Sequence, residues 1–155
     1  MTQTRYAFNY SQDIVNLQTK YSLFKRVANI LFSITFENGF QEGLMTRAIE
    51  LLVERNDCLR LKFEKKGKQN LQYFREKCKV DKIPVKNFTS YGEIEKFVNK
   101  FRKGMVDVFK GETFKPVFAT GPNGEKMLFI KISHLVADTY GIGILVNDLY
   151  QIYNA

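Results

Sequence analysis

A largely apolar run over 127–132, followed closely by a helical pattern over 140–153, constrains the fold more than any other feature of the sequence. The run predicts a buried strand and the pattern predicts a helix. The single histidine of the chain, His134, then falls on the connection between them. An imidazole there is a candidate general base, because connections often carry functional side chains. By itself, a lone histidine is more often a surface residue or a satisfied core residue.

Helix and strand signals alternate along the rest of the chain. The sequences at 66–68 and 121–124 each predict a hairpin turn, because their glycines tolerate the backbone angles of tight turns. The expected helices cover 10–26, 40–55 and 90–104, and the expected strands cover 27–36, 58–64, 70–76, 83–87, 113–119 and 126–132. These elements predict one α/β (α+β) domain over residues 1–155, with a mixed sheet and helices packed on one side.

The helix starts carry recognisable signals. Ser11 is the expected cap of the first helix, and Ser90 with Glu93 predicts a capping box at the start of the third. The first helix also places its larger apolar side chains on one stripe, which predicts a helix packed against the core. That stripe consists of Ile14, Leu17, Tyr21 and Phe24.

The two cysteines, Cys58 and Cys78, lack Cys-x-x-Cys spacing and are not matched by histidine clusters. Neither a metal site nor a disulfide framework is therefore expected, which fits a reduced, cytoplasmic setting. The N-terminal residues show no apolar signal core. No apolar run approaches the roughly 18 residues of a membrane span.

Two motifs resemble those of condensation-type acyltransferases, the superfamily that includes chloramphenicol acetyltransferase, the condensation domains of nonribosomal peptide synthetases, and alcohol acyltransferases. The family motif His-His-x-x-x-Asp-Gly is similar to Ser133-His134-Leu-Val-Ala-Asp138-Thr139. A second family motif, Arg-His-Glu-x-Leu-Arg-x-x-Phe, is similar to the segment 55–63, and the segment 111–118 also agrees with the family. The resemblance implies the N-terminal lobe of a chloramphenicol acetyltransferase-like fold.

The resemblance also implies residue roles. His134 matches the second, catalytic histidine of the motif. Ser133 replaces the first histidine, which is not the base in the family. Thr139 replaces the glycine of the motif, and because glycine allows unusual backbone angles, a side chain there is expected to narrow the channel or tilt the following helix. Gly141, two residues later, is expected to restore part of that freedom.

The aspartate of the first motif forms a structural ion pair with an arginine in the family. Carried onto this chain, the resemblance implies a buried pair between Asp138 and Arg60. Such a pair orders a loop more than it adds stability, because the desolvation of both ions offsets much of their attraction. The alternative is that Arg60 is exposed.

The net charge of +8 indicates acidic partners. In the resembling family these are the phosphopantetheine arm of a carrier protein or the phosphates of coenzyme A, so the implied substrate is a pantetheine thioester and no bound cofactor is expected. Lysine-rich turns such as 64–68 are also typical of solvent exposure alone. Nucleic-acid binding is a poor alternative, because no aromatic-basic motif of a known binding module is present.

Complete members of the resembling family have two lobes, and this chain matches the first. The missing C-terminal lobe, or a neighbouring subunit, is then the expected partner. Three hypotheses follow: the N-terminal lobe of an acyltransferase that uses a carrier protein or coenzyme A, an inactive module of the same fold that docks a carrier protein, and a trimeric acetyltransferase whose site a neighbour completes.

Overall fold

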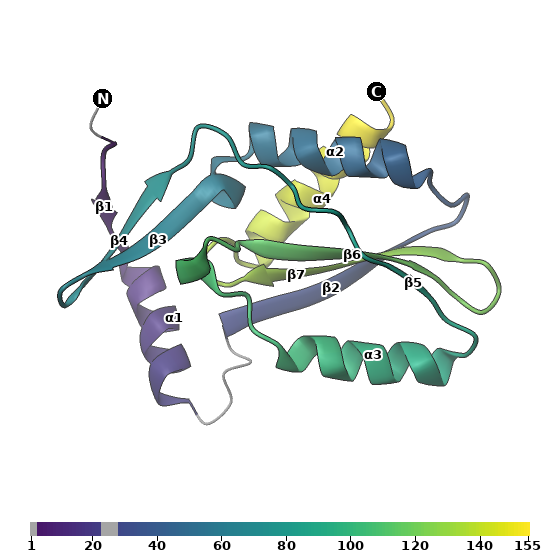
Figure 1. The fold of residues 1–155 in the computed structure, drawn as a ribbon, viewed down its shortest axis with the longest axis horizontal. Helices are drawn as coiled ribbons and strands as arrows, with labels where there is room; N and C mark the ends of the chain where they lie inside the picture. Colours follow the sequence, from purple (N-terminus) through teal and green to yellow (C-terminus); the bar gives the residue numbers. More distant parts are fainter. Residues whose placement is uncertain (1–2, 23–27) are drawn as a thin grey trace.

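Two β-sheets form the framework of residues 3–22 and 28–155, the parts of the chain that the structure, a computed structural model, describes. The larger sheet has the strand order β2-β7-β6-β5 and the smaller has β1-β4-β3 (Figure 1). The strands are β1 (Tyr6–Ala7), β2 (Asn29–Phe36), β3 (Leu61–Lys66), β4 (Gln69–Phe74), β5 (Val85–Asn87), β6 (Phe114–Thr120) and β7 (Lys126–Ser133). The helices are α1 (Tyr10–Tyr21), α2 (Glu42–Arg55), α3 (Tyr91–Lys103) and α4 (Thr139–Tyr153), with short 3₁₀ turns η2 (Asp57–Arg60) and η3 (Val108–Lys110).

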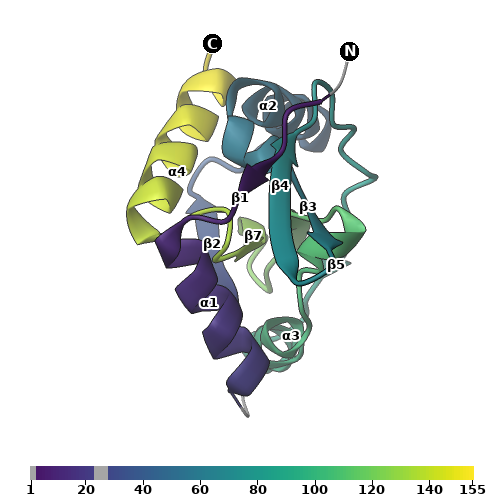
Figure 2. The ribbon, with the colours of Figure 1, turned by 90° about the vertical axis from the view of Figure 1, so that its left-hand side faces the viewer.

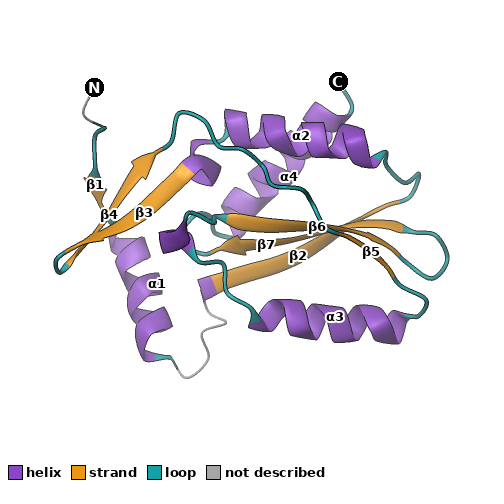
Figure 3. Cartoon of the chain, viewed as in Figure 1, coloured by secondary structure: helices purple, strands orange, loops and turns teal. Residues whose placement is uncertain are grey.

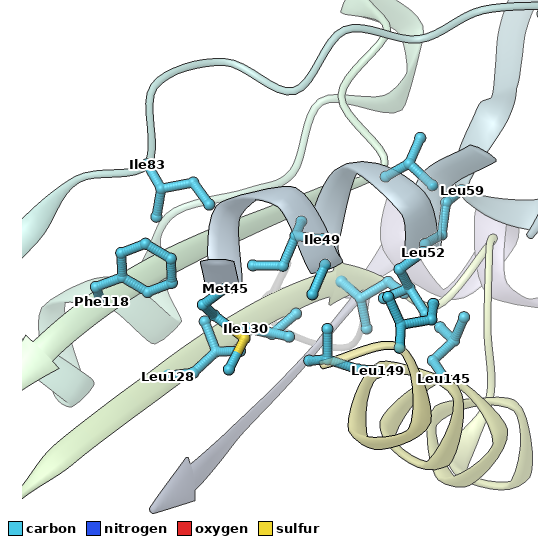
Figure 4. Close-up of a cluster of buried hydrophobic side chains, with 14 residues drawn as sticks. Met45, Ile49, Leu52, Leu59, Ile83, Phe118, Leu128, Ile130, Leu145 and Leu149 are labelled. Atoms are coloured by element: carbon cyan, nitrogen blue, oxygen red, sulfur yellow. The ribbon is translucent and has the colours of Figure 1, made fainter. Parts of the chain in front are cut away.

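Strand β7 lies in the interior of the larger sheet, and its side chains alternate between two covered faces. It pairs antiparallel with β2 and β6, whereas β5 joins β6 in parallel, so the sheet is mixed as predicted. Leu128 and Ile130 lie among the side chains of α2 and α4, as Figure 4 shows. Met127 and Phe129 belong to the apolar cluster beneath α3. Burial on both faces explains the nearly continuous apolar run.

Helices cover both faces of this sheet. α2 and α4 pack on one face, and α3 packs on the other, where the ring of Phe97 meets that of Phe129 at 5.3 Å. Figure 3 shows α3 on the opposite side of the sheet from α2 and α4. The predicted α/β (α+β) class with a mixed sheet is confirmed. Helices were expected on one side of the sheet only, whereas α3 covers the second face as well. The reason is that β6 and β7 are apolar on both faces.

The hairpin turns lie where the sequence predicted them. Gly67 joins β3 to β4 with a φ of 61°, and Gly124 joins β6 to β7 with a φ of 86°. Both values lie in the left-handed region that glycine adopts readily. The cap predicted at Ser90 also forms, since the Ser90 hydroxyl accepts a hydrogen bond from the Glu93 backbone N–H at 3.3 Å. The Glu93 carboxylate instead accepts from the Thr89 backbone N–H at 2.8 Å.

Helix α1 differs from its prediction in its cap and in its orientation. The cap is Asn9 rather than Ser11, because the Asn9 side chain accepts from the Gln12 backbone N–H at 2.9 Å and the Gln12 side chain accepts from the Asn9 backbone N–H at 3.0 Å. The predicted apolar stripe faces outward. Its described members, Ile14, Leu17 and Tyr21, are exposed. Phe24, the predicted end of the helix and the predicted strand start at residue 27 lie outside the described residues.

A second buried cluster joins the smaller sheet to the loop after β7. Phe8 packs edge-on against Phe63 with 5.4 Å between the ring centroids. Leu135, in the loop that follows β7, is buried in the same cluster. The other buried members are Leu61 and Val108. The loop is therefore held by apolar packing as well as by its flanking elements.

Lys131 is a charged residue inside the three-layer core. It lies on β7, is only 3% exposed, and faces α3. Its ammonium donates to the carbonyl oxygens of Phe101 at 2.7 Å and Gly104 at 2.8 Å, at the C-terminal end of α3. Burial, with a smaller contribution from Lys115, holds the pKa of Lys131 below its ordinary value. Lys131 therefore caps α3 from the neighbouring sheet at the cost of desolvation.

This lowered pKa predicts a pH dependence of stability. Between the folded pKa of Lys131 and about 10.4, the ordinary lysine pKa, the unfolded chain binds the proton more strongly than the folded chain does. The contribution of Lys131 to the free energy of unfolding therefore rises with pH through this window. We expect Lys131→Met to flatten that rise, measured by urea unfolding at a series of alkaline pH values. Lys86→Met, at an exposed position of β5, serves as the control and should leave the slope unchanged.

Candidate functional site

His134 is the first residue after the interior strand β7, as the sequence predicted. Its backbone N–H donates to the carbonyl oxygen of Ala28 at 2.7 Å. The carbonyl oxygen of Ser133 accepts from the backbone N–H groups of Val136 at 2.9 Å and Ala137 at 3.3 Å. The chain therefore makes a tight, hydrogen-bonded turn between β7 and α4, with His134 at its start.

The turn forms one wall of an open cleft of about 660 Å³. The opposite walls come from α1 and from the smaller sheet, and in Figure 2 β1 lies between α4 and β4, with α1 below them. The lining residues outside the turn include Tyr6, Asn9, Gln12, Cys58, Gln72 and Phe74. The His134 side chain is partly exposed, and no described residue forms a hydrogen bond with its imidazole. Both ring nitrogens are therefore free to meet a ligand.

Ser133 stabilises the turn rather than contributing a second titratable group. It is 2% exposed, and its hydroxyl accepts from the Leu135 backbone N–H at 3.3 Å. Its own backbone N–H donates to the carbonyl oxygen of Thr113 on the approach to β6. A small hydroxyl side chain fits this buried position.

The predicted ion pair between Asp138 and Arg60 is wrong for this structure, because each residue has other partners. Asp138 is exposed and caps α4, its carboxylate accepting from the Gly141 backbone N–H at 2.8 Å. Arg60 lies in the 3₁₀ turn η2 instead of on the predicted strand, and pairs with Asp57. The Arg60 guanidinium also donates to the carbonyl oxygens of Arg75 and Glu76.

The cap at Asp138 predicts a smaller effect on stability than a buried ion pair. We expect Asp138→Ala to lower the free energy of unfolding by about 1 kcal/mol, the usual cost of losing an N-cap, rather than the roughly 3 kcal/mol of an uncompensated buried charge. Asp138→Asn keeps the capping oxygen and should stay within a few tenths of a kcal/mol of the parent. Urea unfolding of the two variants checks this. Equal losses for both would favour a role for the charge.

Thr139 and Gly141 lie in the first turn of α4 without unusual backbone angles. Among the described residues, only glycines at other positions have a positive φ. Thr139 is exposed and does not line the cleft, so the expected narrowing and strain at this position are absent. A Cβ added at Gly141 would meet the Asp138 carboxylate at 3.4 Å, which is van der Waals contact. The departure from the motif at Thr139 therefore leaves the turn intact.

Cys58 lies in the wall of the cleft. Burial raises the pKa of the Cys58 thiol, so the sulfur is held in its neutral, weakly nucleophilic form. Among the residues that the structure describes, no group of three or more His, Cys, Asp or Glu side chains is arranged to hold a metal ion. None of the described helices is long and apolar enough to cross a membrane.

Sequence reasoning missed Gln12 and Gln72, two residues that join the walls of the cleft. Gln12, on α1, is buried, and its side-chain amide pairs with that of Gln72 on β4. The sequence Asn9-x-x-Gln12 could have indicated the local cap, since it follows the capping-box spacing. Nothing local indicates a partner 60 residues away.

The site is thus a histidine at a strand-to-helix turn in an open cleft, on a lobe whose larger sheet has helices on both faces. The profile of the Condensation domain family matches residues 2–155. The chain belongs to this family, whose solved members have the chloramphenicol acetyltransferase-like fold.

Two solved condensation domains share this fold at low sequence identity. The starter condensation domain of the rhizomide synthetase RzmA has a TM-score of 0.85 and 18% identity, over 97% of this chain and 39% of that one. The condensation domain of the Monacolin K polyketide synthase MokA has a TM-score of 0.85 and 14% identity, over 98% of this chain and 35% of that one. A variant of the RzmA domain has been solved in complex with C8-CoA.

A curated relative is the hybrid PKS-NRPS synthetase pvhA of Talaromyces variabilis, which is 22% identical over 134 residues. The match covers 84% of this chain and 3% of that synthetase. The chain thus spans a small part of the curated relative and a little over a third of the solved condensation domains.

Proposed function

We propose that this chain is the N-terminal lobe of a condensation-type acyltransferase and that His134 is its catalytic residue. The substrate is a pantetheine thioester, carried by a carrier protein or by coenzyme A, and the acceptor is an amine or an alcohol. The observation that supports this most is the position of the imidazole, which lies at the end of the interior strand, lines the cleft and has no hydrogen-bond partner among the described residues. We propose that the reaction takes place in the cytoplasm.

In the proposed reaction, the acceptor nitrogen or oxygen attacks the thioester carbonyl carbon. A ring nitrogen of His134 takes the proton that the acceptor loses. The carbon–sulfur bond then breaks, and the proton passes to the departing pantetheine thiol. The products are an amide or ester and the free thiol, so atoms and charges balance without an oxidant or a metal.

The cleft is open, so orientation of the two substrates requires a second wall. We propose that the C-terminal lobe of a condensation domain, or a neighbouring subunit, supplies it. This proposal is supported by the solved relatives, of which this chain covers 35–39%. The alternative, an inactive module that docks a carrier protein, keeps the same fold without the chemistry.

Acyl transfer by the full-length protein that carries this chain tests the proposal. C8-CoA and carrier-bound acyl groups are offered with amine and alcohol acceptors, and products are followed by mass spectrometry. We expect acyl transfer from at least one donor. The isolated 155-residue chain should show almost none, because substrate positioning contributes several kcal/mol to lowering the barrier. Efficient turnover by the isolated monomer would contradict the proposed need for a second wall, and a full-length protein that binds carrier without turnover would favour the docking module.

A further inference from the structure

We infer that Gln12 is a positioning residue, which orients the His134 turn by holding the carbonyl of Leu135. This inference deepens the proposed function and rests on it. Gln12 is the one buried residue of helix α1, with 8% of its surface exposed. Its inward direction is unusual, because the larger apolar side chains of the same helix, Ile14 and Leu17, are exposed, and Val15 is only partly buried.

The side-chain amide of Gln12 uses its full hydrogen-bonding capacity. Its Nε2 donates to Gln72 Oε1 at 2.8 Å and to the carbonyl oxygen of Leu135 at 3.1 Å. Its Oε1 accepts from Gln72 Nε2 at 2.9 Å and from the Asn9 backbone N–H at 3.0 Å. A primary amide has two N–H donors and two acceptor sites, and all four are occupied. The orientation of the amide is therefore determined by its surroundings.

The bond to Leu135 links the turn to the opposite wall of the cleft. The other backbone bonds around His134 involve Ala28, just before β2, Thr113, just before β6, and the turn itself. Among the described residues, only the Gln12 bond joins the Leu135 carbonyl to α1. The pairing of Gln12 with Gln72 extends this link to β4, and the Gln72 amide also donates to the carbonyl oxygen of Ala7 at 3.2 Å. Because Leu135 directly follows His134, rotation of its peptide would move the imidazole relative to both walls.

Two matched substitutions separate this bond from the rest of the amide pair. Gln12→Glu removes the donors, so the bond to Leu135 is lost while the cap to Asn9 is kept. Gln72→Glu introduces the same charge into the same pair but leaves the Gln12 amide free to donate to Leu135. Leaving a buried hydrogen-bond acceptor without a donor costs free energy. Gln12→Glu should therefore displace the turn, and Gln72→Glu should not.

The single histidine makes this displacement measurable without activity, since one set of imidazole NMR signals reports on His134 alone. We expect Gln12→Glu to shift and broaden these signals and Gln72→Glu to leave them close to those of the parent. Gln12→Met and Gln72→Met form a second pair that removes hydrogen bonding in every protonation state. If a glutamate variant keeps its proton or does not fold, the two Met variants provide the comparison instead.

Acyl transfer by the full-length protein supplies the second readout. Gln12→Glu should lower kcat by about tenfold with little change in KM, because misplacing a reacting group costs rate rather than binding. Gln72→Glu should change kcat much less. Unmoved imidazole signals in both Gln12 variants, equal shifts in the Gln12 and Gln72 variants, or a kcat that responds to His134→Ala but not to Gln12→Glu would overturn the inference. If His134→Ala leaves acyl transfer unchanged, the proposed function fails while the NMR comparison still tests the positioning.

Discussion

Replacing His134 with alanine in the full-length protein is expected to lower acyl transfer by about 100-fold or more, the usual contribution of a general base. The imidazole is the only titratable group of the turn that faces the cleft without a partner among the described residues. Asp138 also lines the cleft, but one of its carboxylate oxygens caps α4. Steady-state kinetics with a saturating thioester donor measures this effect.

The controls separate loss of chemistry from loss of structure. His134→Ala should leave the unfolding midpoint nearly unchanged, because no hydrogen bond to a described residue is lost with the ring. Thr139→Ala, at an exposed position next to the cleft, should keep most of the turnover. If acyl transfer persists in His134→Ala, the imidazole is not the base. If neither protein turns over but both bind an acylated carrier protein, the docking-module alternative is favoured.

Phe63→Ala is expected to lower the free energy of unfolding by about 3–5 kcal/mol, the usual cost of truncating a buried aromatic side chain. Phe63 is 1% exposed and lies at the centre of the cluster that joins the smaller sheet to the His134 turn. Its ring meets those of Phe8 at 5.4 Å and Phe109 at 6.4 Å. Urea unfolding measures the loss, and the His134 NMR signals should broaden as Leu135 loses its packing partner.

Phe74→Ala is the matched control, on the strand that pairs with the strand of Phe63. Phe74 is 42% exposed and makes one edge-on contact, with Tyr6. We expect its loss to cost about 1 kcal/mol or less, the value of a single aromatic pair near solvent. A cost as large as that of Phe63→Ala would mean that burial in this cluster does not set the size of the loss.

Most elements of the fold could be predicted because their signals are local. The apolar run over 127–132 predicted the interior strand, and the glycines at 67 and 124 predicted two hairpins, since the turn angles depend on the residue itself. The position of His134 after the strand followed directly from that run. The motifs around it indicated the family that the Condensation domain profile confirms over residues 2–155.

The sequence pattern alone could not decide how α1 is oriented. Ile14 and Leu17 predicted a buried stripe by their helical spacing, but spacing identifies a face without saying what lies against it. In the structure, α1 contacts the rest of the chain through Val15, which packs on the second buried cluster, and through Gln12, whose partners are 60 and 123 residues away. A polar contact of this kind depends on how separate elements meet, which periodicity does not encode.

Partner choice at the motif residues was likewise decided by tertiary structure. The terminal nitrogens of Arg60 bind Asp57, three residues away, and the carbonyls that follow β4, whereas its buried Nε has no partner among the described residues. Asp138 is placed at the start of α4, where the free backbone N–H of Gly141 is the nearest donor that it uses. The sequence by itself determined the strand, the turn and the histidine, because these follow from neighbouring residues. Only the packing of distant segments determined which groups hold that histidine in place, because hydrogen bonds and burial are assigned after the chain has brought those segments together.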